Sequence, residues 1–255
     1  SGWTGDSQIF FNTAAYLTDY AAFARKHVRD IFDRQYKSGR LPQIAPRVNE
    51  DKFLWWLNGA VGWACAGVYI PLYLYERYGD KRVLEEHYED ILDYADFMIR
   101  RAGKWGGVYS KPVFLSWKNQ KYLVNCGCAY GEWSEPSDVS AFHWYDFMTT
   151  KPEESTAYTY FTLHRVLKIA DILKKPKTKR LARIQKYSEG AKRAYRELVT
   201  KPKFLLDTDR QAKLVRPLYM GLLTAEQEDF AKKRLIRALE NYGWRLGTGF
   251  LSTPF

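Results

Sequence analysis

Helical periodicity runs through most of these 255 residues and constrains the fold more than any other feature. Apolar residues recur about every 3.6 positions, with charged residues opposite, as in amphipathic helices. Mostly paired as hairpins, the segments predict an all-α protein and suit a helical toroid. We expect helices at 10–36, 57–78, 80–102, 152–173, 178–198, 211–220 and, capped by Thr224, 225–241.

Residues 103–151 interrupt this pattern with glycines, prolines and tryptophans. Long irregular segments inside compact domains are usually functional. We expect this one to be a long irregular loop that covers one mouth of the toroid. Short apolar runs at 113–115 and 122–124 predict a small hairpin within it.

The first six residues are Ser1-Gly2-Trp3-Thr4-Gly5-Asp6. Because glycine tolerates backbone angles that other residues do not, we expect a tight turn here rather than a helix or strand. Such a turn would present the Trp3 ring beside the Asp6 carboxylate, and a sugar could stack on the ring while its hydroxyls donate to the acid. The alternative is that Asp6 caps a helix and Trp3 is buried.

This opening segment, continuing into Ser7-Gln8-Ile9-Phe10, resembles the core motif of glycoside hydrolase family 78, the bacterial and fungal α-L-rhamnosidases. Later stretches agree in order, so that the resemblance spans the chain. They are Gly62-Trp63, Tyr78-Gly79-Asp80, Tyr130-Gly131-Glu132-Trp133, Thr156-Ala157-Tyr158 and Gly247-Thr248-Gly249-Phe250-Leu251-Ser252-Thr253-Pro254.

The resemblance implies an (α/α)6 barrel, of which this chain would hold a part, as a single domain over 1–255. It also implies hydrolysis of terminal non-reducing α-L-rhamnosyl residues by an inverting mechanism. The family's general acid would fall before Ser1 and its general base beyond Phe255. We therefore expect the isolated chain to be inactive.

The resemblance also assigns residues that hold the substrate. Trp3 would stack on the rhamnose and Asp6 would accept hydrogen bonds from its hydroxyls. Trp63 and Trp133 would be further aromatic walls, with core packing as the alternative for both. Glu132 would also bind the substrate, although the family usually has Asp at this position.

A competing interpretation places catalysis inside the chain. Glycoside hydrolysis needs two carboxyl groups, and their separation decides the stereochemistry. Asp6 would then be the base, with Glu132 or Glu135 as the acid.

The net charge is +11, and basic residues gather between 168 and 196. Lysines on a helix exterior usually form a solvated face, and no nucleic-acid module is recognisable, so we expect no nucleic-acid partner. The expected partner is a rhamnose-containing glycoside or polysaccharide, with an acidic polymer left open.

The sequence shows no P-loop, no dinucleotide fingerprint, no metal-binding His motif and no Ser-His-Asp order. We therefore expect no cofactor and no metal. Cys65, Cys126 and Cys128 give no disulfide framework. Without an apolar run of membrane length we expect no membrane partner, while the compartment stays open.

Two other classes of function remain open. One is another helical-toroid glycosidase, trehalase-like or glucosidase-like, which a substrate panel would separate. The other is a non-catalytic carbohydrate-binding helical scaffold, which predicts that no glycoside is hydrolysed.

Overall fold

The computed structural model describes residues 2–46, 55–107, 110–127, 129–141 and 143–255. The chain divides into two compact units. The first unit holds Ser1–Arg101 with Phe161–Ser188, and the second holds Ala102–Tyr160 with Glu189–Phe255. Ser1 and Cys128 lie outside the described residues, and the single domain over 1–255 stays a prediction.

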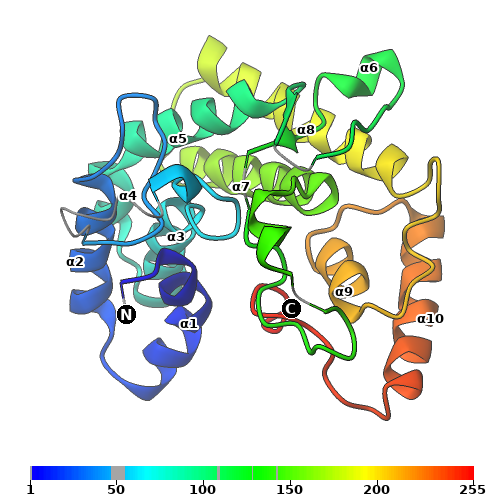
Figure 1. The fold of residues 1–255 in the computed structure, drawn as a ribbon. Coiled ribbons are helices and arrows are strands. Elements are labelled where there is room, and N and C mark those ends of the chain that lie inside the picture. Colours follow the sequence, from blue (N-terminus) through cyan, green and yellow to red (C-terminus); the bar gives the residue numbers. More distant parts are fainter. Residues whose placement is uncertain (1, 47–54, 108–109, 128, 142) are drawn as a thin grey trace. The chain divides into compact units, whose positions relative to one another are not determined.

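The first unit is built around helix α3 (Ala66–Tyr78), which packs against its three neighbours α1, α2 and α4 (Figure 1). Its Val68, Ile70 and Leu74 are at most 1% exposed, so that apolar burial on several sides holds the helix in place. The other helices of this unit are α1 (Thr4–Leu17), α2 (Ala21–Phe32), α4 (Lys81–Glu86) and α5 (Tyr88–Arg101), and a 3₁₀ turn spans Trp55–Leu57.

The second unit combines short elements with helices. Strand β1 (Trp105–Gly106) pairs in parallel with β2 (Asn125–Cys126), and helix α9 (Gln211–Tyr219) packs against α10 (Ala225–Asn241). The remaining short elements are α6 (Trp117–Gln120) and a 3₁₀ turn at Trp144–Met148.

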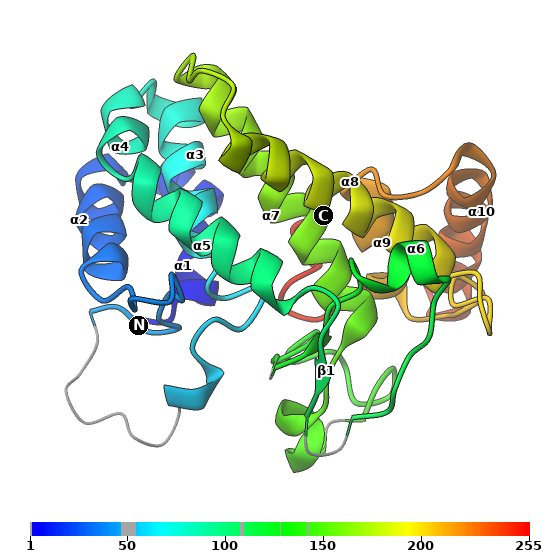
Figure 2. The same ribbon diagram turned by 90° about the horizontal axis from the view of Figure 1, so that it is seen from above.

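Two long helices, α7 (Pro152–Ile172) and α8 (Lys179–Leu198), contribute residues to both units. Figure 2 shows them side by side. At the second-unit end, the Tyr195 hydroxyl of α8 donates to Glu153 of α7 at 2.7 Å.

The all-α prediction is confirmed, because the only strands among the described residues are the two short ones. The described residues of the segment at 103–151 are also irregular as predicted, and the helices and strands among them are short. The predicted hairpin of 113–115 with 122–124 is wrong, because the paired residues are those of β1 and β2 and they run in parallel.

Three predicted helices are shorter than expected. The helix predicted over 10–36 is two helices, because the extended backbone of Thr18 ends α1. The one predicted over 57–78 begins only at Ala66, since Gly59 and Gly62 adopt φ of 80° and 79°, which a right-handed helix excludes. The one predicted over 80–102 is interrupted at the buried His87, and Asp80 caps its first part.

The later helices agree with prediction to within one or two residues. The predicted capping box is confirmed, because Thr224 Oγ1 accepts from the Gln227 N–H at 3.3 Å and Gln227 Oε1 accepts from the Thr224 N–H at 3.0 Å. No helix in the described ranges is both long enough and apolar enough to cross a membrane.

Candidate functional site

The conspicuous segment at the start of the chain is largely helical. Trp3 flanks α1 with φ −65° and ψ 122°, and the helix begins at Thr4. The predicted tight turn is therefore wrong. Gly5 is required for another reason, because a Cβ atom there would lie 2.6 Å from the Trp63 ring. The glycine lets the backbone of α1 lie directly on the indole.

This helix start is fixed by backbone hydrogen bonds to a neighbouring extended segment. The Thr4 N–H donates to the Gln43 carbonyl at 2.8 Å, and the Ala45 N–H donates to the Gly2 carbonyl at 2.8 Å. One turn further on, the Gln8 amide donates to the Gly62 carbonyl. The backbone that carries Trp3 and Asp6 is thus held on both sides.

Asp6 lies in the first turn of α1, where the helix dipole favours a negative charge. It is not the N-cap residue, so the capping alternative is wrong. Burial raises the pKa of the Asp6 carboxyl, although a backbone hydrogen bond partly opposes this. Its carboxylate forms no ion pair within the described ranges. Asp6 and Trp3 are each partly exposed, as a binding pair must be.

Trp63 is 3% exposed and packs against the Gly5 backbone. This is the core-packing contact, and an aromatic wall role for Trp63 stays a prediction. In the same unit Trp55 is 50% exposed and Trp56 is 37% exposed.

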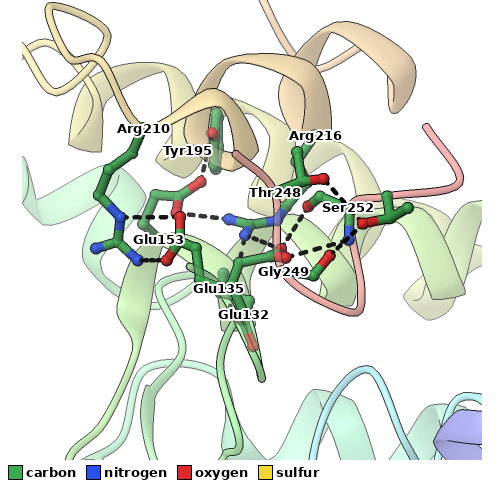
Figure 3. Close-up of polar contacts among 11 residues, drawn as sticks. Glu132, Glu135, Glu153, Tyr195, Arg210, Arg216, Thr248, Gly249 and Ser252 are labelled. Atoms are coloured by element: carbon green, nitrogen blue, oxygen red, sulfur yellow. Dashed lines mark hydrogen bonds and ion pairs between the residues drawn. The ribbon is translucent and has the colours of Figure 1, made fainter. Parts of the chain in front are cut away.

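The second unit contains a buried cluster of charged residues around Arg216 of α9 (Figure 3). Arg216 is 1% exposed and donates to Glu132 and, at 2.7 Å, to Glu153. Glu132 also accepts from Ser252, through the backbone N–H at 3.1 Å and through the hydroxyl. Both oxygens of Glu132 are therefore occupied by protein donors.

Trp133 follows Glu132 and is held by the same chain segments. Its carbonyl accepts from the Phe250 N–H at 2.6 Å, and its ring meets Tyr130 edge-on at 6.2 Å between centroids. The ring is 37% exposed and lines a cavity of about 360 Å³ together with Glu135 and Arg210. Trp133 is thus an accessible aromatic surface in a hollow, and its contact with substrate stays a prediction.

Glu135 is also paired. Both of its oxygens accept from the Arg210 guanidinium, one of them at 3.2 Å, and its side chain is 3% exposed. Asp6 belongs to the first unit, whereas Glu132 and Glu135 belong to the second. The catalytic pairing of Asp6 with either glutamate stays a prediction, and it would require an acid that is already bound to an arginine.

Glu154 is the least well paired acid near Arg216, since its nearer oxygen lies 3.9 Å from the guanidinium. Burial raises its pKa to about 7, with Arg216 opposing and Glu132 adding to the rise. Its Oε1 is buried and has no hydrogen-bond partner within the described part of the chain.

Sequence reasoning missed this cluster, because its members come from distant segments. One signal was available: Arg216 lies four positions after Ala212 on the buried side of a short helix, where a charge requires a partner. The described residues contain no group of three or more His, Cys, Asp or Glu side chains that could hold a metal ion.

The whole chain, residues 1–255, matches the family model described as bacterial alpha-L-rhamnosidase 6 hairpin glycosidase domain. An alpha-L-rhamnosidase of Streptomyces avermitilis is 29% identical, over 99% of this chain and 21% of the relative. One from Formosa agariphila is 26% identical, over 99% of this chain and 24% of the relative. The chain spans about a fifth to a quarter of the length of these curated relatives.

Solved structures are similar over the same extent. The Streptomyces avermitilis alpha-L-rhamnosidase complexed with L-rhamnose has a TM-score of 0.76 at 28% identity, over 99% of this chain and 21% of that one. The native alpha-L-rhamnosidase from Aspergillus terreus has a TM-score of 0.71 at 25% identity, over 99% of this chain and 27% of that one.

Proposed function

Because the chain belongs to the bacterial alpha-L-rhamnosidase six-hairpin glycosidase family, we propose that it carries the sugar-holding part of a domain that hydrolyses terminal α-L-rhamnosyl bonds. The partner is then a rhamnose-containing glycoside or polysaccharide. One relative has been solved with L-rhamnose bound, which supports this choice of sugar.

The observation that carries the proposal is the partly buried Asp6 carboxylate in the first turn of α1, three positions after Trp3. Asp6 is partly buried, lies in the first turn of a helix and forms no ion pair among the described residues, so its oxygens are available to sugar hydroxyls. Hydrogen bonds that involve a charged group contribute about 1.5–3 kcal/mol. A stacked aromatic face adds apolar contact for the ring and the methyl group of a 6-deoxy sugar.

The proposed reaction is an inverting hydrolysis. A base takes a proton from water, the water oxygen attacks the anomeric carbon, and an acid gives a proton to the departing glycosidic oxygen. Asp6 and Trp3 hold the sugar in this scheme. Since Glu132 and Glu135 are occupied by arginines, we expect the isolated chain to bind L-rhamnose without turning over an aryl α-L-rhamnoside.

The test is L-rhamnose binding, measured by ligand-observed NMR on the chain and on Asp6→Asn. We expect Asp6→Asn to weaken binding by about 10- to 100-fold, because it removes the charge from the hydrogen bonds. Asp229→Asn is the matched control, since Asp229 is exposed on α10 and pairs with Lys233. Binding of D-glucose as tight as that of L-rhamnose would contradict the proposal.

A further inference from the structure

The second unit has a second cavity, next to the one that Trp133 lines. It measures about 290 Å³, close to the lower end of small-molecule pockets. The two cavities share Gly131, Glu132, Lys151 and Arg210 in their walls. A ligand that spans both would therefore meet the Trp133 ring and the charged cavity together.

Two polar groups in the wall of this cavity have an atom that lacks a hydrogen-bond partner among the described residues. The buried Oε1 of Glu154 lacks a hydrogen bond among the described residues. The Lys213 ammonium, which is half-buried, has no ion pair or side-chain hydrogen bond to any residue in the described ranges. A buried polar atom without a partner has a desolvation cost, so both groups point to a ligand that supplies what is missing.

The two arginines that line this cavity already form ion pairs with glutamates. Arg216 is bound to Glu132 and Glu153, and Arg210 is bound to Glu135. Burial lowers the pKa of the Lys213 ammonium, and Arg210 and Arg216 add to this effect, although Glu153 opposes it. The Lys151 ammonium donates to the Ala129 and Asp146 carbonyls. Lys213 is then the cation of this wall with neither an ion pair nor a side-chain hydrogen bond among the described residues, and an anionic group of a ligand would supply its partner.

We propose that this cavity binds an acidic sugar of the uronate type, with the carboxylate on Lys213 and a hydroxyl on Glu154. The ring would extend toward Trp133, which offers a partly exposed face in the adjoining cavity. This proposal rests on the proposed function, because it takes the ligand to be an acidic residue of a rhamnose-containing glycan.

A sugar acid fits better than a small inorganic anion. Sulfate would pair with Lys213, but it has only acceptor oxygens and offers no donor to the ionised Glu154 carboxylate. A uronate carries both a carboxylate and hydroxyl donors, and thereby matches both unpartnered groups.

The test compares D-glucuronate with D-glucose, which differ at carbon 6, by calorimetry or ligand-observed NMR on the full chain. We expect glucuronate to bind at least about tenfold more tightly, since only its carboxylate can pair with Lys213. Lys213→Met should remove this preference, and Lys213→Arg should keep most of it. Lys232→Met is the matched control, because Lys232 is exposed on α10 and pairs with Glu228.

L-rhamnose binding is measured on the same variants, so the two proposals fail separately. Lys213→Met should leave L-rhamnose binding unchanged, which also shows that the variant is folded, and Asp6→Asn should leave glucuronate binding unchanged. Loss of L-rhamnose binding alone would count against the proposed function. Equal binding of glucose and glucuronate, sulfate binding as tight as that of glucuronate, or an unaltered preference in Lys213→Met would each overturn the uronate site.

Discussion

Arg216 and Arg180 are each surrounded by three carboxylates, yet their surroundings differ. Arg216 lies inside the second unit with a side chain 1% exposed, and Arg180 lies on the first unit with a side chain 30% exposed. The acids around Arg216 are Glu132, Glu153 and Glu154, and those around Arg180 are Glu89, Asp93 and Asp96.

The comparison shows that the number of ion pairs around an arginine does not by itself decide how much they contribute to stability. Burial lowers the pKa of both guanidinium groups, but the neighbouring carboxylates outweigh it, so that each pKa is raised overall. Around Arg180, water can replace any lost partner. Around Arg216 it cannot, and each charge depends on the others. Breaking a buried pair therefore costs far more than breaking an exposed one.

Arg180 also bears on the basic segment at 168–196. Lys168 pairs with Glu76, Arg180 pairs with three acids, and Arg183 pairs with Asp96. Part of this positive charge is thus matched by acids of the first unit. Lys213, which lines the second cavity and forms no ion pair among the described residues, lies outside the basic segment.

The largest expected effect is that of Arg216→Met. The substitution leaves three buried carboxylates without their shared cation, and we expect the second unit to lose about 3–5 kcal/mol of stability. Urea titration, followed by hydrogen exchange of α9 and of residues 247–252, would measure the loss and locate it. A loss below about 1 kcal/mol would mean that burial does not distinguish the two arginines.

A smaller effect, dependent on pH, is expected for Glu154→Gln. Glu154 faces Arg216, Lys151, Glu132 and Glu153, and its pKa in the folded chain is about 7, above its ordinary value. The protonated Glu154 carboxyl therefore adds to the free energy of unfolding. This contribution is fully present when the pH lies below the ordinary pKa of a glutamate, and it is lost as the pH rises through about 7. Between pH 5 and pH 8 we expect the free energy of unfolding of the wild type to fall by about 1–2 kcal/mol because of this group. Glu154→Gln should not show this fall.

The measurement is a set of urea titrations from pH 5 to pH 8 on both proteins, read as the difference between them. That difference should grow with pH. Parallel curves would show that Glu154 does not change its protonation in this range, and that the cavity keeps one charge throughout.

The smallest expected effect is that of Arg180→Met. Its three ion pairs are solvated, so we expect a loss of less than about 1 kcal/mol, confined to the first unit and reduced further by salt. Urea titration at low and at high ionic strength would measure it. A loss equal to that of Arg216→Met would remove the contrast between the two clusters.

Local signals explain what could be predicted from the sequence. The capping box at Thr224 and Gln227 lies within four residues, and the start of α7 follows from Pro152 at the first helical position. The all-α class and the irregular segment at 103–151 also follow from hydrophobic periodicity, which is visible in residues that are close together in the sequence.

The errors arose where a distant residue decides the local structure. Gly5 suggested a turn, but the glycine accommodates Trp63, which lies 58 positions away in the sequence. The sugar contact expected of Glu132 from its motif position stays a prediction, but the sequence did not indicate that its oxygens meet Arg216 and Ser252. Periodicity carries no information about such partners, since they are brought together only by the packing of the second unit.

The hydrogen bond from Ser252 to Glu132 joins residues 120 positions apart, and Arg216 lies 84 positions after Glu132. During synthesis at about 5–20 residues per second, Glu132 leaves the ribosome several seconds before Arg216 exists. Throughout that interval the Glu132 carboxylate cannot form its ion pair with Arg216. The buried cluster of the second unit can form only after Ser252, the last of these residues, has been made. Water is therefore excluded from Glu132 and Arg216 only at the end of translation.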